Sequence, residues 1–528
     1  MAEEKNSRRD FLGAGAMLLA AAGAQGSHGM DAEKACLADV RNFGATGDGK
    51  TLDSPAINKA IEASAAGGGG TVCFPAGTYH CYSIHLNSNV TLWLMQGATI
   101  LAADSPEEGS SKGYDLAESN APWESYQDFG HNHWQNSLIW GEGLENVSIL
   151  GPGLIWGRGL SRGWGAGPKA ESPGVGNKAI ALKNCRNVLL RDFGILHGGH
   201  FGILATGVDN LTIDNLTIDT NRDGMDIDCS RNVHVSNCTV NSPWDDGICL
   251  KSSYALGYAR ATERVTIANC VVSGDFEEGS VLDGSFRHFG TESKVPRTGR
   301  IKFGTESNGG FKNITIANCV FDGCQGFALE SVDGAVLEDV SITNITMRDL
   351  FNPPFFLRLG ARMRGPEGTG VGTIRRVAIR NVVCSNTASS ISSVVSGVPG
   401  NPIEDLRLSD ILIEHRGGGT QPDASRRLQE AEKEYPEPNM FGQTPSHGFF
   451  LRHARGIEMN NVKIQAQKDD IRPAFVLEDV RDAEFVGVRA PHAEGRPTYL
   501  LRDVGEFRLH RCRPVGDVEI GEAREKVL

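Results

Sequence analysis

A short pattern of alternating apolar residues recurs along most of this chain, and each copy starts at a turn residue, often Asn. The spacing is 23 residues from Val188 to Leu211, 22 from Leu211 to Val233 and 26 from Ile314 to Val340. Alternation rich in Val, Ile and Thr predicts β-strands. Strands that return at such intervals, with few helices between them, are typical of solenoid coils. We therefore expect an all-β fold, a right-handed parallel β-helix. The copies are ENVSILG (145–151), RNVLLRD (186–192), DNLTIDNLTI (209–218), RNVHVSNC (231–238), ERVTIANC (263–270), KNITIANC (312–319), EDVSITNI (338–345), RRVAIRNV (375–382), EDLRLSDI (404–411) and RGIEMNNV (455–462).

A different unit precedes the coils. The stretch LDSPAINKAIEASAAGGGGTVCFPAGTY (52–79) predicts a helix that Asp53 or Ser54 caps, with Pro55 in its first turn and Gly67 to Gly70 at its end. Such a helix would cover the open end of a solenoid. We expect one β-helix domain over residues 36–520, with an N-terminal cap at 36–80. Long loop insertions are expected near 273–299 and 414–447.

The N-terminal segment predicts export. Residues 1–30 include NSRRDFLGAGAMLLAAAGAQG, with twin arginines at Arg8 and Arg9 and a small-residue cleavage site at Ala22–Ala24. The apolar run is too short, and too rich in Ala and Gly, for a membrane span. We expect a twin-arginine signal that leads to a periplasmic or secreted protein, with no stable membrane insertion after the signal is removed.

The amino-acid composition limits the kinds of molecule that this protein is expected to bind. Glycine makes up 65 of 528 residues, about 12% against a usual level of roughly 7%, which indicates many tight turns. The net charge is −13 and no long basic run occurs, which argues against nucleic-acid binding. The twelve cysteines form no metal-binding pattern. Four of them follow Asn in the repeat and predict stacked, buried turn positions rather than disulfides: Cys185, Cys238, Cys270 and Cys319. We expect a monomer.

Five carboxylates fall within two neighbouring repeats. NRDGMDIDCS (221–230) carries Asp223, Asp226 and Asp228, and NSPWDDGICLKSS (241–253) carries Asp245 and Asp246. Asp223 and Asp245 are 22 residues apart, close to one coil. Successive coils of a parallel sheet lie about 4.8 Å apart, so we expect these carboxyl groups within about 5–10 Å of each other. That range includes the roughly 6.5–9.5 Å separation of an inverting glycosidase.

Asp245 and Asp246 can face one cleft only if the chain bends, because adjacent strand residues point to opposite faces. Pro243 and Gly247 predict such a bend. Crowded acids suit acid–base catalysis, since repulsion makes one of them keep its proton. Two other interpretations stay open: acidic turn residues bonded to backbone amides, which we favour for Asp228, and a calcium site. We expect no cofactor, with calcium as the less favoured alternative.

At these residues the sequence resembles the polygalacturonase family, glycoside hydrolase family 28 of the pectate-lyase-like β-helix superfamily, as a divergent bacterial member. Its members are right-handed parallel β-helices that hydrolyse pectin-type polysaccharides with inversion. The family's Asn-Thr-Asp motif is matched by Asn221 to Asp223, with Arg222 in the variable middle, and its Asp-Asp motif by Asp245 and Asp246. The resemblance implies that Asp245 is the general acid and that Asp223 and Asp246 hold and activate the water.

The family usually has Gly-His-Gly one coil after the Asp pair, and then Arg-Ile-Lys, whose cations bind a galacturonate carboxylate. Here Arg300 and Lys302 belong to an Arg-Ile-Lys run that falls one coil too early, and Glu330 stands where a Lys is expected. This departure puts galacturonate in the central subsite in doubt. Other cations could substitute, since arginine binds carboxylates through two N–H groups, and His200 is a candidate to replace the family His. The candidate substrate-binding residues are Asn221, Lys251, Arg300, Lys302, Glu330, Arg358 and His200.

The leading hypothesis is an exported glycoside hydrolase that cleaves pectin-like or related plant cell-wall polysaccharides or oligosaccharides by an inverting, two-carboxylate mechanism. One alternative is a polysaccharide lyase on the same scaffold. Another is a carbohydrate-binding β-helix without catalysis. The β-helix alone does not separate these functions, because one fold hosts many of them.

Overall fold

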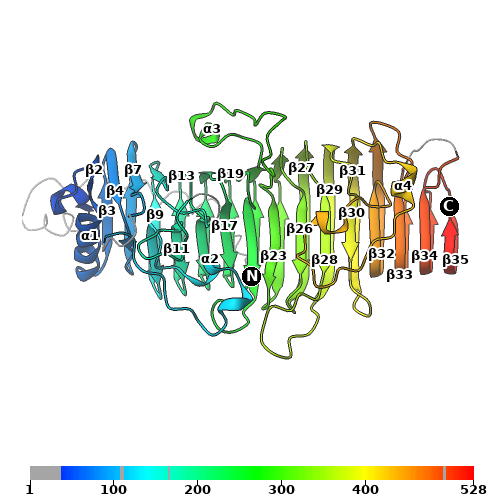
Figure 1. Cartoon of the computed structure of the whole chain (residues 1–528), viewed down its shortest axis with the longest axis horizontal. Helices are drawn as coiled ribbons and strands as arrows, with labels where there is room; N and C mark the ends of the chain where they lie inside the picture. Colours follow the sequence, from blue (N-terminus) through cyan, green and yellow to red (C-terminus); the bar gives the residue numbers. More distant parts are fainter. Residues whose placement is uncertain (1–36, 107–111, 164–166, 491–494) are drawn as a thin grey trace, which may run out of the picture.

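The strands predicted from the repeat stack as the coils of a parallel β-helix. The computed structural model describes residues 37–106, 112–163, 167–490 and 495–528; the predicted signal at 1–30 lies outside these residues. All 35 strands join one hydrogen-bonded sheet that winds along the long axis of the molecule (Figure 1). The predicted spacing is confirmed, since Val188 pairs with Leu211, Leu211 with Val233, and Ile314 with Val340.

The coils have three faces, which we call sheets A, B and C. The strands of sheet A are β5 (Ile84–His85), β8 (Ile139–Glu142), β11 (Lys178–Lys183), β14 (Phe201–Thr206), β17 (Asp223–Asp228), β20 (Ile248–Ser252), β23 (Ile301–Ser307), β26 (Phe327–Ser331), β28 (Phe355–Leu359) and β30 (Ser393–Ser396). The strands of sheet B are β1 (Leu37–Asp39), β3 (Gly70–Phe74), β6 (Val90–Leu94), β9 (Glu145–Leu150), β12 (Arg186–Arg191), β15 (Asp209–Asp214), β18 (Arg231–Ser236), β21 (Thr262–Ala268) and β24 (Phe311–Ala317). The strands of sheet C are β2 (Asp48–Leu52), β4 (Gly77–Cys81), β7 (Ala98–Ala102), β10 (Leu154–Trp156), β13 (Gly194–Leu196), β16 (Thr217–Asp219), β19 (Thr239–Asn241), β22 (Val271–Ser273) and β25 (Val320–Asp322).

Longer strands follow in the C-terminal coils and bend from one face into the next. These are β27 (Val336–Arg348), β29 (Thr373–Thr387), β31 (Ile403–His415), β32 (Phe449–Ala466), β33 (Phe475–Val486) and β34 (Tyr499–His510). Their inward residues alternate with exposed ones, as in the predicted repeats, and one continuous apolar core fills the solenoid. No helix in the described part of the chain has the length and apolarity to cross a bilayer.

Each end of the solenoid is closed by a different element. Helix α1 (Ser54–Ala66) packs at the N-terminal end and buries Ile57 and Ile61, while Gly67 ends it (Figure 1). Asp53 stands at the predicted capping position, but its carboxylate accepts hydrogen bonds from the preceding turn rather than from the helix. At the other end β35 (Val518–Val527) pairs antiparallel with β34.

The turn between sheets B and C is built on a ladder of asparagines. Asn237, Asn269, Asn318, Asn344 and Asn381 have φ between 54° and 58°, a left-handed conformation that Asn adopts more readily than most residues. From Asn269 onward, each side-chain amide donates to the Asn of the preceding coil, at 3.3, 3.1, 3.0 and 2.7 Å.

The predicted stack of Asn-Cys pairs is partly wrong. Cys238, Cys270 and Cys319 follow the asparagine ladder and point into the core. Cys185 instead follows the turn between sheets A and B, because Asn184 comes directly after β11. Every described cysteine is a free thiol.

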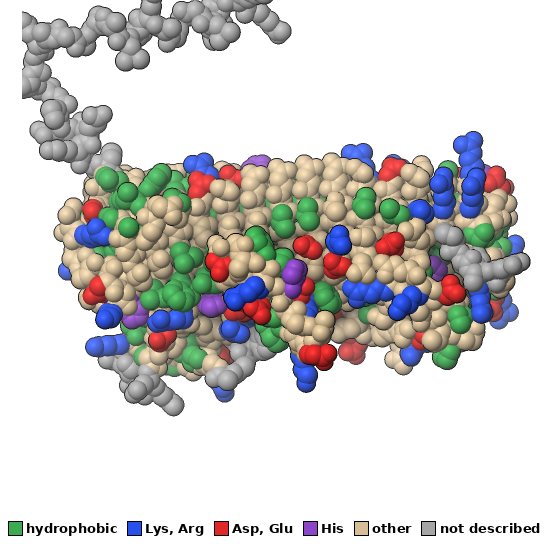
Figure 2. Space-filling view, turned by 90° about the horizontal axis from the view of Figure 1, so that it is seen from above, with side chains coloured by type: hydrophobic (Ala, Val, Ile, Leu, Met, Phe, Trp, Pro, Cys, Tyr) green, Lys and Arg blue, Asp and Glu red, His purple; other side chains and the backbone are tan. Residues whose placement is uncertain are grey.

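Loops and short helices lie outside the coils. One segment precedes β8 and contains α2 (Phe129–Asn132), and residues 274–300 connect β22 to β23 through α3 (Ser280–Asp283). Residues 416–448 connect β31 to β32 and contain α4 (Gln421–Ala424) and a 3-10 turn at Pro438–Phe441; we call them the insertion. On the face seen in Figure 2, acidic, basic and apolar side chains are interspersed.

Candidate active site

Strand register brings the two predicted Asp motifs together on sheet A. Met225 of β17 pairs with Ile248 of β20, so counting two residues back on each strand places Asp223 opposite Asp246. The amide of Gly224 donates to the carbonyl of Asp246 at 2.9 Å. Residues 243–247 form a bend before β20, as Pro243 and Gly247 predict, and the bend turns Asp245 toward the same side. One carboxylate oxygen from each of Asp223, Asp245 and Asp246 lies within 4.8 Å of the others.

These oxygens approach more closely than the predicted 5–10 Å. The span that accommodates a water between the acid and base of an inverting glycosidase is roughly 6.5–9.5 Å, and retaining pairs lie about 5–5.5 Å apart. Contacts between nearest oxygens are shorter than distances between carboxyl centres.

Asp223 is the most isolated of the three carboxyl groups. Its side chain is buried, and no described residue gives it a hydrogen bond or an ion pair. Burial, followed by repulsion from Asp245 and Asp226, raises the pKa of Asp223 well above its ordinary value. This carboxyl group therefore retains a proton at pH values where an exposed Asp has lost it.

Asp246 has the opposite environment. Arg300 Nε donates to it at 2.8 Å and Lys302 Nζ lies 3.4 Å from its other oxygen. Lys302 lies on β23 and Arg300 directly precedes this strand. Both cations therefore belong to the coil after the Asp pair, as the sequence predicts. Burial opposes ionisation, but Lys302 and Arg300 hold the pKa of Asp246 below its ordinary value. The site thus places a carboxyl group with a raised pKa beside one with a lowered pKa.

Asp245 is the most accessible carboxylate of the cluster, with 29% of its side chain exposed. It accepts hydrogen bonds from Arg222, at 3.1 Å from Nε and 2.9 Å from Nη2. Burial opposes the charge of this guanidinium, yet Asp245 and Asp223 raise the pKa of Arg222 above its ordinary value. Neighbouring Asn221 is buried, and its side-chain oxygen has no hydrogen-bond partner in the described part of the chain. Asn221 is thereby placed beside the cluster with an unused acceptor.

A second buried ionic cluster lies on the same face of sheet A. Lys251 Nζ is 3.1 Å from Glu306 and 3.7 Å from Asp226, and His131 of α2 is 3.2 Å from Asp226. Arg364 Nη2 donates to Glu306 at 2.9 Å. Burial opposes ionisation of Glu306, but Lys251 holds its pKa well below the ordinary value. Lys251 therefore contacts this second cluster rather than Asp245 or Asp246.

Asp228 matches the expected structural role. It accepts hydrogen bonds from the amide of Ser253 at 2.8 Å and from its hydroxyl at 2.6 Å. These bonds connect β17 to the chain that follows β20. Asp228 therefore holds two coils together.

His200 lies one coil before Arg222, since Phe201 pairs with Asp223. Its ring stacks on Phe201, with centroids 4.2 Å apart, and its Nε2 has no hydrogen-bond partner among the described residues. Burial, followed by the charge of Arg222, lowers the pKa of His200 well below its ordinary value. The imidazole is consequently neutral and borders the cluster from the N-terminal side.

Glu330 and Arg358 lie farther along sheet A. Glu330 Oε2 is 3.7 Å from Lys302 Nζ, and neither carboxyl oxygen has a hydrogen-bond partner in the part of the chain described here. Burial raises the pKa of Glu330 to about 8. Arg358 pairs in register with Glu330 and donates to the insertion, at 2.8 Å to the carbonyl of Glu430 and 3.1 Å to that of Ala431. The structure therefore does not bring Arg358 to the three aspartates.

Open space adjoins the cluster on its N-terminal side. A cavity of about 660 Å³ is lined in part by Trp244, Leu160, Arg158 and Arg162. The carbonyl of Arg162 accepts a hydrogen bond at 3.0 Å from the guanidinium of Arg222, which also holds Asp245. The cavity thus reaches Trp244, which precedes Asp245 in the chain, and Arg162, whose carbonyl contacts the guanidinium that binds Asp245.

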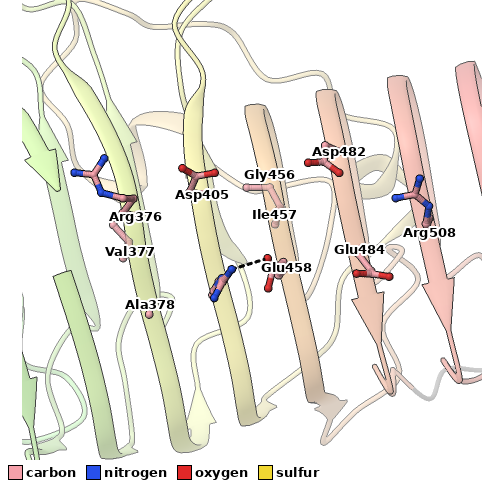
Figure 3. Close-up of a pocket in the computed structure, with 11 residues that line it drawn as sticks. Arg376, Val377, Ala378, Asp405, Gly456, Ile457, Glu458, Asp482, Glu484 and Arg508 are labelled. Atoms are coloured by element: carbon pink, nitrogen blue, oxygen red, sulfur yellow. Dashed lines mark ion pairs between the residues drawn. The ribbon is translucent and has the colours of Figure 1, made fainter. Parts of the chain in front are cut away.

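Another cavity, of about 550 Å³, lies on the outer face of sheet B in the C-terminal coils (Figure 3). It is lined by residues of β29, β31, β32, β33 and β34, including an Arg407–Glu458 ion pair of 3.1 Å. Asp223 and Asp246 belong to sheet A, so this cavity has no part in the carboxylate site.

Comparisons with known proteins agree with this fold and these motifs. A family model described as "Rhamnogalacturonase A/epimerase, pectate lyase-like" matches residues 37–139, and one described as "Right handed beta helix region" matches residues 174–397. A probable polygalacturonase of Vitis vinifera is 23% identical over 411 residues, covering 71% of this chain and 74% of that protein. The chain is therefore similar to polygalacturonases over most of its length. The right-handed parallel β-helix predicted from the repeat is confirmed.

Two further proteins similar to this chain are named as an exo-poly-alpha-D-galacturonosidase and an exopolygalacturonase. An exo-poly-alpha-D-galacturonosidase of Dickeya chrysanthemi is 29% identical over 219 residues, 41% of this chain and 34% of that protein, so the chain spans about a third of its length. The structure of a hyperthermoactive exopolygalacturonase from Thermotoga maritima has a TM-score of 0.59 and 19% identity, covering 82% of this chain and 92% of that one. The structural likeness establishes the shared fold.

Two residues at the site were missed by reasoning from the polygalacturonase motifs. Arg222 was placed only in the variable middle of Asn221–Asp223, although an arginine next to a catalytic-type Asp is itself a signal. Glu437 reaches the site from the insertion and pairs with Arg300 and Lys302. Only its flanking prolines, Pro436 and Pro438, mark a stretch with a fixed backbone in the sequence.

Proposed function

We propose that this protein is an exported glycoside hydrolase that cleaves pectin-like plant cell-wall polysaccharides or oligosaccharides. The observation that carries the proposal is the convergence of Asp223, Asp245 and Asp246 within 4.8 Å, directly after Trp244, which lines an open cavity. Hydrolysis of a glycoside needs one carboxyl group that donates a proton and one carboxylate that accepts a proton from water. The relatives named for polygalacturonase activity support the substrate class.

In the proposed mechanism Asp245 is the general acid, because it is the most exposed group of the cluster and directly follows Trp244, which lines the cavity. Its proton passes to the glycosidic oxygen as the bond to the anomeric carbon breaks. Asp246, kept ionised by Arg300 and Lys302, takes a proton from the water that attacks that carbon, and Asp223 positions the water. Carboxyl groups this close titrate as a unit, so the proton of the resting site belongs to the cluster as a whole. Asp245 must release Arg222 before it donates.

The hydrolysis proposed here needs no metal. Arg300 and Lys302 already balance the charge of Asp246, and Arg222 that of Asp245. We expect unchanged activity after treatment with a chelator. Export through the twin-arginine pathway is part of the proposal and rests on Arg8, Arg9 and the apolar run after them.

The proposal is tested by a screen of galacturonan and rhamnogalacturonan oligosaccharides, with the anomer of the first product followed by NMR. We expect cleavage with inversion. Asp245→Asn and Asp246→Asn should each lower kcat/KM by about 10²–10⁴-fold, the usual contribution of general acid–base catalysis. Asp283→Asn, an exposed aspartate on α3, is the matched control and should leave kcat/KM unchanged.

Three outcomes would contradict the proposal. An unsaturated product that absorbs ultraviolet light would indicate a lyase. A retained anomer would contradict the inverting mechanism. Binding without turnover of any oligosaccharide would indicate a carbohydrate-binding β-helix.

A further inference from the structure

The insertion places a carboxylate on the two cations that hold Asp246. Glu437 Oε1 accepts a hydrogen bond from Arg300 Nη2 and lies 3.3 Å from Lys302 Nζ. The same insertion contributes Tyr435, whose hydroxyl lies 3.1 Å from Thr305 Oγ1 and whose ring lies 5.7 Å from Lys302 Nζ. Both cations are buried, whereas 26% of the Glu437 side chain is exposed. Glu437 and Tyr435 thus stand between the cations and the solvent.

Buried arginines of sheet A hold the insertion in this position. Arg358 donates to the carbonyls of Glu430 and Ala431, and Arg452 donates to those of Leu428 and Gln429, at 2.8–3.2 Å. Both guanidinium groups also lie over the ring of Phe441, at 5.3 and 5.5 Å from its centroid. Two charged anchors and an aromatic one fix the backbone on either side of Glu437.

The charges of this cluster are already balanced within the chain. Arg300 and Lys302 carry two positive charges, and the carboxylates of Asp246 and Glu437 carry two negative ones. Burial opposes ionisation of Glu437, but Arg300 and Lys302 keep its pKa below the ordinary value. A third carboxyl group, Glu330, lies 3.7 Å from Lys302, and its pKa of about 8 keeps it protonated at neutral pH. The cluster accommodates two carboxylate charges and resists a third.

We propose that Glu437 is a specificity-determining residue that occupies the position of a substrate carboxylate, so that the sugar ring bound beside Asp246 is a neutral one. An acidic ring at this position would have to displace Glu437 or bring a further negative charge to a cluster that is already neutral. Like charges placed together at an interface weaken binding strongly. A ring with a primary alcohol in place of the carboxylate meets no such repulsion. The inference rests on the proposed function, since it places one sugar of the substrate beside Asp246.

The test compares two ligands that differ only in charge: trigalacturonate, and the same trisaccharide with its carboxyl groups reduced to primary alcohols. Their Kd values are measured by calorimetry in an Asp245→Asn background, which prevents turnover. With Glu437 intact we expect the neutral trisaccharide to bind more tightly. Glu437→Ala, which removes charge and bulk, should shift the ratio of the two Kd values toward trigalacturonate by about tenfold or more, as relief of a like-charge contact implies.

Two further variants keep the test decisive. Glu437→Gln retains most of the side chain, so it guards against a loosened insertion and should shift the ratio in the same direction. Glu434→Ala is the matched control, because Glu434 is an exposed glutamate of the same insertion that no described residue pairs with; its ratio should not change. Tighter binding of trigalacturonate with Glu437 intact, unchanged ratios in both Glu437 variants, or no binding of either ligand would overturn the proposal.

Failure of this inference and failure of the proposed function give different results. The binding ratio is measured without catalysis, so it reports on Glu437 alone. Loss of the hydrolase proposal would appear as absent cleavage in the chain with Asp245 intact. A chain that cleaves with inversion but whose binding ratio ignores Glu437 would keep the function and discard the inference.

Discussion

Arg222 is the residue that most affects how the site keeps the proton that Asp245, the proposed general acid, donates. Its guanidinium binds Asp245 and also opposes the rise in the pKa of Asp223. A general acid works only while the site holds its proton, so activity falls as the pH rises past the pKa of the cluster. A cation this close to the carboxyl groups favours their ionised form, so they lose their proton at lower pH.

Arg222→Gln should therefore move the alkaline limb of the kcat/KM–pH profile to higher pH by about one unit, the lower end of what a neighbouring opposite charge produces. The profile is measured on the best substrate of the oligosaccharide screen. Arg191→Gln, an exposed arginine on sheet B, should leave both limbs in place. An unmoved alkaline limb in Arg222→Gln would show that this ion pair does not control the proton.

Glu330 gives a prediction about stability. Its pKa is about 8 in the folded chain against an ordinary 4.5. Below pH 4.5 both folded and unfolded chains hold this proton, so the group costs nothing. Between pH 4.5 and 8 the unfolded chain releases the proton while the folded chain keeps it, so stability falls as the pH rises through this window.

Glu330→Gln removes this loss. Its free energy of unfolding in urea should be close to that of the unaltered chain at pH 4.5 and exceed it by about 4 kcal/mol at pH 8, because one pKa unit corresponds to about 1.4 kcal/mol. Glu367→Gln, an exposed control, should show no pH-dependent difference. Equal stabilities of Glu330→Gln and the unaltered chain at pH 8 would contradict the assigned proton.

The aspartate cluster could be predicted from the sequence because the 22 residues between Asp223 and Asp245 are close to the length of one coil of the β-helix. Asp223 and Asp246 lie on consecutive strands whose register follows from the repeat. Glu437 could not be predicted in this way. It comes from a loop between β31 and β32, and the path of a loop across sheet A depends on contacts such as those of Arg358 and not on any periodicity.

At the level of elements, the asparagine ladder explains why the turn between sheets B and C repeats so regularly. Asn269 has φ of 58°, donates to Asn237 at 3.3 Å and accepts from Asn318 at 3.1 Å. Two contributions are combined there: a backbone conformation that most side chains disfavour, and hydrogen bonds between coils.

Two substitutions separate these contributions. Asn269→Gly loses the hydrogen bonds but keeps a backbone that tolerates positive φ. Asn269→Ala loses both, so it should unfold in urea with a free energy about 1 kcal/mol lower than that of Asn269→Gly, the usual cost of a left-handed residue with a Cβ. Equal stabilities of the two variants would show that hydrogen bonding alone determines the residue at this turn.

The elements themselves were predictable where alternation was clear. The expected repeats match strands of sheet B and the long strands that continue it: β9, β12, β15, β18, β21, β24, β27, β29, β31 and β32. Strands β33 to β35 lie beyond the last predicted copy of the repeat, RGIEMNNV at 455–462. The sequence assigns Cys185 to the wrong turn because two different turns of one coil contain the same Asn-Cys dipeptide.

For the whole molecule, the main physical problem is how the two open ends of the solenoid are covered. A parallel solenoid exposes both its core and a row of unpaired backbone groups at a terminal coil, and such an edge can pair with another chain. Helix α1 covers one end (Figure 1). At the other end β35 reverses direction, pairs with β34 and buries Ile520 and Ala523 against the last coil.

We expect the intact chain to be a monomer, and removal of β35 should make it associate through its C-terminal end. A chain that stops after Asp517 leaves the hydrogen-bonding edge of β34 uncovered, together with apolar side chains such as Phe507 and Leu509 that now lie in the core. Light scattering coupled to size exclusion should give a mass of at least two chains for the truncated protein. Glu519→Gln, which removes a charge from β35 but keeps the strand, should remain monomeric. A truncated chain that folds and stays monomeric would show that the last coil protects its own edge and that the antiparallel strand is dispensable.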